Sequence, residues 1–485
     1  MKKLNLSFNV VEIFKEKRFR YGGYATLVTL AAIIVLVVAN LIMQQIPAEV
    51  DMTENKLFTL SRQTFDLIDR LEDDVTIYGL YKTGQESENV VDVLSKYERA
   101  SSKINLEFVD PDKNPVLLQK YDEEKSGLSG GTLVVESGDR FKVIPSFDLY
   151  DVSYSQQGQA RVMGFKAEQR ITNALLYVSS GVTPKIYEIT GHGEYTLVQL
   201  GLLTTIEKEN FEIEELNLLT TPQIPEDADI ITLLSPEFDL TEGEAEVLRT
   251  YLENDGSALV FIDYNNVEMP VLNSVLGSFG INVEMSIVME GDREHLYDPD
   301  NPLWIAPVIV SHEITDPLRE DNLTVLMPNS MPVIELDIKK RNVEIASLLE
   351  TTESSWVRTN LEEGSPLKEE DDREGPAYLA VAVSKRKSEM SEPEGYRLIV
   401  SGNAKFIGYI PPFGTLKPNV DFFLNSLAWL NKRSDSISIR SKSLFTLPLR
   451  ISGQLQLIYA GIFVLLIPIG LLIAGLVIWL RRRHL

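Results

Sequence analysis

Two long uncharged stretches near the ends of the chain constrain its folding more than any other feature. Residues 24–43 and 457–480 contain no Asp, Glu, Lys or Arg. Twenty helical residues rise about 30 Å, which matches the hydrocarbon core of a bilayer. We therefore expect two transmembrane helices, over residues 24–46 and 455–480. Two buried helices of a soluble core are the alternative, but neither stretch has a polar face.

The charged residues around these stretches predict their orientation. Basic residues remain on the cytoplasmic side, so both termini are expected in the cytoplasm of a two-pass cell (inner or plasma) membrane protein, with about residues 47–454 outside. A cleaved signal peptide is the alternative for the first stretch, but QQIPAEV is a poor cleavage site. The flanking basic residues are Lys15, Lys17, Arg18 and Arg20 before the first stretch and Arg481, Arg482 and Arg483 after the second; Glu49, Asp51 and Glu54 follow the first.

Composition excludes several classes of function. The formal net charge is −25, whereas nucleic-acid binding requires a basic surface that releases counterions. The chain has no cysteine, which excludes disulfides, thiol catalysis and cysteine-based zinc sites. It also has no Gly-Lys pair, so a P-loop for ATP is absent. We expect no cofactor and no metal.

The first part of the exported region alternates helices with apolar strands. Ser61 is expected to cap a helix whose apolar face is Phe65, Ile68 and Leu71. A hairpin around Gly138 and Asp139 completes the layer. We interpret this α/β region as thioredoxin-like without a CxxC motif. The expected elements are strands 75–81, 104–110, 131–137 and 140–145 and a helix over 88–102.

The second part predicts a doubly wound α/β domain with a parallel sheet. Thr241 and Glu244 have the spacing of a capping box at the start of one helix. Residues 360–376 are rich in acids and turn formers, so we expect an exposed loop. The other expected elements are strands 185–190, 211–218, 228–236, 257–263 and 397–408 and helices 165–180, 195–209, 241–254 and 419–431.

The complete expected organisation follows from these segments. It comprises a cytoplasmic basic tail (1–23), a transmembrane helix (24–46), a membrane-proximal domain (47–164), a bridging helix (165–180), a second α/β domain (181–436), a linker (437–454), a transmembrane helix (455–480) and a cytoplasmic tail (481–485).

Two motifs carry a family resemblance. They are DMTENKLFTLS at 51–61 and ITGHGE at 189–194, and with the two flanking apolar stretches they make the chain similar to the GldG family. Members of that family are auxiliary components of ABC-type transport systems of the gliding-motility-associated type. The resemblance implies a GIFT-type, amidotransferase-like second domain. It also implies a non-ATPase membrane subunit that works with a separate ABC permease and ATPase and receives cargo or an exported partner.

The segment Gly191-His192-Gly193-Glu194 is the strongest candidate site. It follows a strand of the expected parallel sheet, where ligands of such sheets usually bind, and its glycines permit close backbone approach. We expect it to bind a ligand or partner. The alternative is a tight turn in which His192 is hydrogen-bonded locally.

Catalysis is not expected from this chain. An amidotransferase-like enzyme needs a nucleophilic cysteine, and no G-x-S-x-G elbow supplies a serine instead. His295 and His312 lack the paired spacing of zinc ligands, and Asp110 with Asp112 is read as a turn rather than a calcium site. A membrane-tethered hydrolase and a cell-envelope scaffold without a transporter remain the alternative functions.

Overall fold

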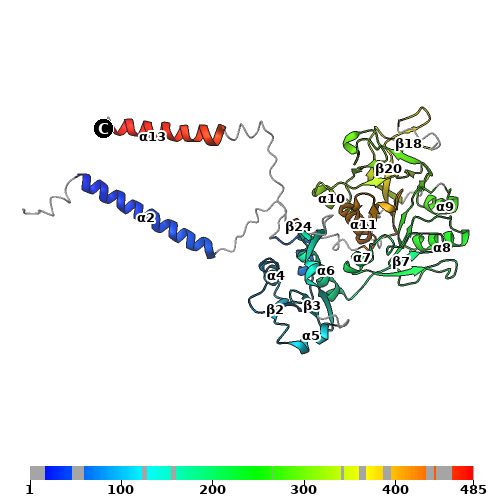
Figure 1. Cartoon of the computed structure of the whole chain (residues 1–485), viewed down its shortest axis with the longest axis horizontal. Helices are drawn as coiled ribbons and strands as arrows, with labels where there is room; N and C mark the ends of the chain where they lie inside the picture. Colours follow the sequence, from blue (N-terminus) through cyan, green and yellow to red (C-terminus); the bar gives the residue numbers. More distant parts are fainter. Residues whose placement is uncertain are drawn as a thin grey trace, which may run out of the picture. The chain divides into compact units, whose positions relative to one another are not determined.

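The computed structural model describes residues 17–45, 59–122, 128–154, 160–265, 267–339, 343–359, 367–385, 395–432, 442–443 and 461–483. The chain divides into two compact units, Met1–Thr59 and Leu60–Leu485 (Figure 1). Residues 1–16 and 484–485 of the expected tails, most of the DMTENKLFTLS motif and all but two residues of the expected linker lie outside the described residues. The described ends of the two tails, residues 17–23 and 481–483, continue the helices α2 and α13 rather than forming separate tails.

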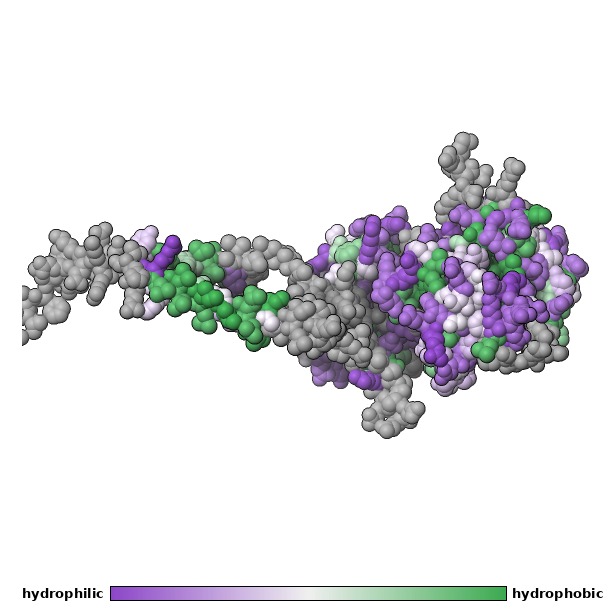
Figure 2. Space-filling model, turned by 90° about the horizontal axis from the view of Figure 1, so that it is seen from above, coloured by the Kyte–Doolittle hydropathy of each residue, from purple (hydrophilic) through white to green (hydrophobic). Residues whose placement is uncertain are grey.

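Two apolar helices occupy the positions expected from the uncharged stretches. Helix α2 (Lys17–Gln45) lies in the first unit, and a π-helical turn (Gly461–Leu466) leads into α13 (Ile467–Arg483). In the described part of the chain, Val464–Arg481 is long and apolar enough to cross a membrane, whereas Thr26–Val38 is a shorter apolar stretch. Figure 2 shows green apolar surface on the helical segments and a mainly purple surface on the folded part. The apolar helix near the C-terminus is confirmed, and the two-pass arrangement stays a prediction.

The N-terminal part of the second unit contains a four-stranded sheet in the order β2-β1-β3-β4. Strands β1 and β2 are parallel, and β3 and β4 form the expected antiparallel hairpin around Gly138. Its elements are β1 (Val75–Leu80), β2 (Ile104–Val109), β3 (Leu133–Ser137), β4 (Arg140–Ile144), α3 (Arg62–Asp69), α4 (Glu88–Ala100), α5 (Pro115–Tyr121) and α6 (Ala167–Ser180).

Helix α3 begins where its capping residue predicts. Ser61 accepts a hydrogen bond from the Thr64 N–H at 3.2 Å, which satisfies one of the free amide groups of the first turn. The buried face of α3 is Thr64, Leu67 and Ile68, whereas Phe65 is 41% exposed. The prediction that Phe65 belongs to the core face was therefore wrong. The buried hydroxyl of Thr64 bonds to α6 through Glu168 and occupies that face instead.

Helix α6 packs on β3 and β4 and also contacts the next part of the chain. Glu209 is buried against it and accepts hydrogen bonds from Gln169 Nε2 at 2.9 Å and Asn173 Nδ2 at 2.6 Å. Burial raises the pKa of Glu209, while the nearby Arg170 opposes that shift. Strands β5 (Tyr150–Tyr154) and β6 (Ala160–Phe165) precede α6 and form a small sheet with β24 (Lys442–Ser443), which pairs with β6.

A ten-stranded sheet forms the centre of the larger part. Its parallel half has the order β8-β7-β9-β10-β21, and its other half is antiparallel. The strands are β7 (Lys185–Ile189), β8 (Glu212–Leu216), β9 (Ile230–Leu234), β10 (Ser257–Phe261) and β21 (Arg397–Ser401), then β20 (Tyr378–Lys385), β17 (Val343–Glu350), β16 (Val333–Glu335), β14 (Val308–Ile309) and β11 (Ile281–Val283). The mixed α/β class is confirmed, and the antiparallel half was not predicted.

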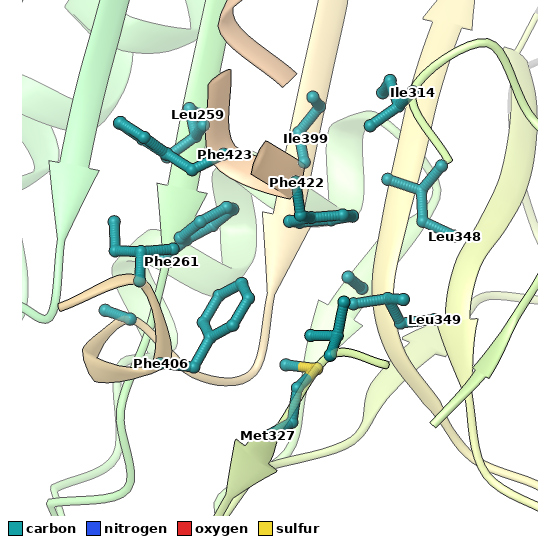
Figure 3. Close-up of a cluster of buried hydrophobic side chains, with 14 of the residues drawn as sticks. Leu259, Phe261, Ile314, Met327, Leu348, Leu349, Ile399, Phe406, Phe422 and Phe423 are labelled. Atoms are coloured by element: carbon teal, nitrogen blue, oxygen red, sulfur yellow. The ribbon is translucent and has the colours of Figure 1, made fainter. Parts of the chain in front are cut away.

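Helices and two apolar clusters cover both faces of this sheet. One cluster contains Phe422 and Phe423 of α11 with Leu259, Phe261 and Ile399 of the sheet (Figure 3). The other packs α8 and α9 on the opposite face. The helices are α7 (Leu203–Lys208), α8 (Glu242–Glu253), α9 (Pro270–Ser278), α10 (Asp316–Glu320) and α11 (Lys417–Leu430); short strands are β12 (Ile287–Met289), β13 (Trp304–Ile305), β15 (Met327–Pro328), β18 (Trp356–Arg358), β19 (Arg373–Glu374), β22 (Tyr409–Ile410) and β23 (Gly414–Thr415).

Two further expectations require correction. The helix expected over 195–209 begins only at Leu203, because Gly201 adopts a φ of +74° and interrupts the backbone before it. The loop expected over 360–376 is mostly exposed in its described part, residues 367–376, as predicted, but it is not free of packing. Asp372 is buried there in an ion pair with Arg358, at 2.6 Å between Oδ2 and Nη2, and residues 360–366 lie outside the described part.

Candidate functional site

The Gly191–Glu194 segment lies at the point where the parallel half of the sheet changes direction. In the order β8-β7-β9-β10-β21, strand β8 lies on one side of β7, and β9, β10 and β21 lie on the other side. The loops after β7 and β9 therefore meet at the carboxyl edge of the sheet. This is the general ligand position in sheets of this topology.

Both glycines of the segment are required by their surroundings. Gly191 has a φ of +126° and Gly193 a φ of +80°. A Cβ at Gly191 would lie 3.0 Å from Asn217 Nδ2, and one at Gly193 would lie 2.9 Å from the Glu237 Cβ. The segment is therefore held tightly between the ends of β8 and β9.

The His192 ring lies between two carboxylates. Its Nδ1 is 3.0 Å from Glu194 Oε1, and its Nε2 is 3.1 Å from Glu244 Oε2. The three side chains are 6%, 1% and 4% exposed. A neutral imidazole has one N–H, so both contacts are hydrogen bonds only when this cluster of His192, Glu194 and Glu244 holds one additional proton.

Backbone groups fix the same segment to its neighbours. The His192 N–H donates to Glu194 Oε2 at 2.7 Å, and the His192 carbonyl accepts from the N–H groups of Glu237 and Phe238 at 2.8 and 3.1 Å. Glu244 also accepts from the Thr241 N–H at 2.9 Å in the predicted capping box. The segment is therefore joined to the start of α8 and to the loop after β9.

The surface of this site comes from other residues. His192 and Glu194 direct their side chains inward, so they do not contact solvent, whereas Gly191 and Gly193 are exposed. Leu219 after β8 and Phe238 after β9 are 56% and 63% exposed. Sequence reasoning missed Phe238, although a large aromatic residue in a turn directly after a buried strand is a recognisable signal of a contact surface.

A second buried carboxyl group lies beneath the same loop. Glu188 on β7 is 3% exposed and accepts a hydrogen bond from the Leu197 N–H at 2.6 Å. Burial raises the pKa of Glu188 to about 7, and the neighbouring Glu215 adds to the shift. Nothing in the sequence pattern indicated this group, because Glu188 occupies one position of an otherwise apolar strand.

The remaining candidate histidines take local partners. His295 Nδ1 lies 3.1 Å from the Ala306 carbonyl oxygen. His312 Nδ1 lies 3.2 Å from the Ile314 amide nitrogen, and burial lowers the pKa of His312. Among the residues that the structure describes, no group of His, Asp and Glu has the arrangement of a metal site.

The Asp110 and Asp112 carboxylates also have local partners. Asp110 Oδ1 accepts from the Asp112 N–H at 3.1 Å, as in an Asx turn, and its Oδ2 lies 2.9 Å from the ammonium of Lys113. Asp112 lies 2.7 Å from the ammonium of Lys82. These contacts are those of a charged surface turn.

Comparison with known proteins finds a family match for most of the larger part. Residues 183–407 match the family described as an ABC-type uncharacterized transport system. This match contains the His192 site. Residues 54–147 match a domain family of unknown function. No curated protein matches the chain.

Two solved structures are similar to parts of the chain at low identity. The mmIFT52 N-terminal domain is 16% identical with a TM-score of 0.36, over 51% of this chain and 97% of that one. The NTD_N/C domain of the alkylhydroperoxide reductase AhpF from Enterococcus faecalis (V583) is 15% identical with a TM-score of 0.18, over 33% of this chain and 79% of that one.

Proposed function

We propose that this chain is a non-ATPase auxiliary subunit of an ABC-type transport system. The match of residues 183–407 to a transport-system family is the observation that carries the proposal. The chain lacks a Gly-Lys pair and hence a P-loop, so a separate ATPase and a permease would supply hydrolysis and the pathway. The resemblance to the GldG family supports the same role. The chain itself then acts by binding rather than by catalysis.

The proposed anchoring is a two-pass arrangement with both ends in the cytoplasm. Leu36 of α2 and Leu472 of α13 are 69% and 72% exposed, as expected for side chains that contact lipid. In the sequence, basic residues precede the first apolar segment and follow the second. Residues of about 47–454 would then face the exterior as two α/β domains.

The fold of each exported domain supports its proposed type. The order β2-β1-β3-β4, with one parallel and two antiparallel pairs, is compatible with a thioredoxin-like layer without redox chemistry. The order β8-β7-β9-β10-β21, with helices on both faces, is compatible with a GIFT-type domain.

The contact surface for cargo or an exported partner is proposed at Gly191 and Gly193 with Leu219 and Phe238. The buried cluster of His192, Glu194 and Glu244 would hold this surface rigid rather than touch the partner. Preorganisation of this kind reduces the entropy lost on binding.

The absence of cysteine makes a direct test of the anchoring simple. Val116 is 80% exposed on α5, so Val116→Cys supplies a single reactive thiol, and a cysteine added after Leu485 supplies another. A membrane-impermeant maleimide should label the first thiol in intact cells and the second only after lysis. Labelling of the added terminal cysteine in intact cells would overturn the two-pass arrangement.

The transport role is tested by purification of the intact chain in mild detergent. A permease and an ATPase encoded beside it should copurify in constant ratio, and Phe238→Ala should leave that ratio unchanged because the surface faces the exterior. Recovery of the chain without either protein would favour the envelope scaffold instead.

A further inference from the structure

A cavity of about 650 Å³ lies beside strand β16 in the antiparallel half of the large sheet. It is separate from the carboxyl edge that carries His192. One wall is β16 with the residues that follow it, and the other includes β19 and the residues between β19 and β20. A volume of this size is typical of ligand sites in proteins.

The register of β16 determines where its backbone groups point. The Leu336 N–H donates to the Gly280 carbonyl, and the Pro332 carbonyl accepts from the Glu284 N–H. Amide groups alternate sides along a strand, so those of Val333 and Glu335 face away from β11. The N–H and carbonyl of Val333 face β20, where Val333 pairs with Tyr378.

The pairing between β16 and β20 ends after that single residue pair. If the same register continued, Glu335 would lie opposite Pro376. Proline has no N–H to donate to the Glu335 carbonyl. Pro376 lines the cavity. The N–H and carbonyl of Glu335 are therefore directed into the cavity as the open end of a strand edge.

The opposite wall presents a similar edge. The Gly375 N–H donates to the Ser355 carbonyl, so Gly375 and Arg373 direct their amide groups toward β18. Glu374 lies between them and directs its amide groups away from β18. Glu374 also lines the cavity, and its amide groups lie on the side of β19 that is not paired with β18.

The charged residues that line this cavity nearly balance, with Glu335, Asp337 and Glu374 against Lys339 and Arg373. Lys339 pairs with Glu335, Lys368 lies 2.9 Å from Glu374, and Arg373 lies 2.7 Å from Glu284. The apolar lining includes Val357 and Ala377, and Ile338 beside the cavity is 91% exposed. The site therefore selects for backbone hydrogen bonds and apolar side chains and not for net charge.

We propose that this cavity binds an extended, uncharged protein segment that adds as a strand to the open edge of β16 at Glu335. An extended backbone presents an N–H and a carbonyl together at the spacing of a strand edge. β-Branched side chains suit both the extended conformation and the apolar lining. Open edges of this kind are the usual positions for strand addition. The inference goes beyond the proposed transport role and does not depend on it.

The test uses the full-length chain in detergent and the peptide acetyl-Thr-Val-Thr-Val-Thr-amide. A peptide of the same sequence with every amide N-methylated keeps the side chains but cannot donate hydrogen bonds. Loss of one or two backbone hydrogen bonds weakens binding about tenfold. We expect fluorescence anisotropy to measure binding of the first peptide and at least about tenfold weaker binding of the second. Equal binding of the two peptides, or no binding of either, would overturn the proposal.

The protein side of the contact is tested by a matched pair of variants. Glu335→Pro removes the N–H that faces the cavity but keeps the backbone N–H and carbonyl groups of Ile334 and Leu336, which face β11. Glu335→Gln keeps the N–H of residue 335. The first should lose peptide binding and the second should retain it.

Hydrogen–deuterium exchange on the unmodified chain gives a measurement that does not depend on folding of a variant. The peptide should slow exchange in residues 332–339 and leave the edge strand β2 (Ile104–Val109) unchanged. Protection of both edges alike would mean nonspecific strand pairing, which contradicts the proposed site.

Discussion

Replacement of Glu188 by Gln should change how the stability of the large domain depends on pH. Glu188 lies on β7 beside Thr232 of β9 and Glu215 of β8 in the register. Its side chain is on the sheet face that packs against the cluster containing Phe422 and Phe423. Gln has nearly the same shape and retains an oxygen that accepts from the Leu197 N–H. The substitution therefore removes the charge and keeps the hydrogen bond.

The magnitude follows from the shift in pKa. Burial raises the pKa of Glu188 from 4.5 to about 7 in the folded protein. Between these values the folded state binds more protons than the unfolded state, so the free energy of unfolding falls as pH rises through this window and levels off above it. At about 1.4 kcal/mol per pH unit, the loss at pH 8 is about 3 kcal/mol. Gln cannot ionise and avoids this loss.

Urea unfolding followed by tryptophan fluorescence is a suitable assay. Trp304, Trp356 and Trp429 all lie in the same domain as Glu188. The variant and the original chain should differ little at pH 5, and the variant should be more stable by about 3 kcal/mol at pH 8. The exposed Glu212→Gln controls for removal of one acidic charge. An equal difference at the two pH values would refute the reasoning, because a titrating group cannot produce it.

Three other substitutions test the packing of the large domain by the same unfolding assay. Arg358→Ala should destabilise it by about 3–5 kcal/mol, because Asp372 would remain buried without its cation; a loss below about 1 kcal/mol would mean that the pair is solvated. Gly402→Ala should cost about 3 kcal/mol, since its Cβ would lie 1.9 Å from the Met331 carbonyl oxygen. Gly243→Ala, at a helical position with no neighbour closer than 3.9 Å, should instead stabilise by about 0.5 kcal/mol. Similar losses for the two glycine variants would contradict the role assigned to the close contact at Gly402.

Interactions between residues close in sequence were predictable. The Ser61 cap, the capping box of Thr241 and Glu244 and the hairpin at Gly138 all formed as expected. Each depends on groups within a few residues, so the local pattern contains both partners.

The candidate site was predictable only in part. The position of the Gly191–Glu194 segment after a strand was clear, and Glu194 lies two residues from His192. Glu244 lies 52 residues from His192, and it contacts the ring only because the start of α8 lies beside the loop after β7. The buried position of the ring could therefore not be deduced from the motif.

The sequence by itself determined the two apolar segments, the alternation of strands and helices and the helix starts, because these depend on side-chain polarity and spacing along one segment. Tertiary structure decided which buried polar groups became partners, such as Arg358 with Asp372, and where the strand ladder of β16 ends. Those outcomes depend on which distant segments are brought together, and a buried charge or a strand edge acquires its partner only when the chain has folded around it.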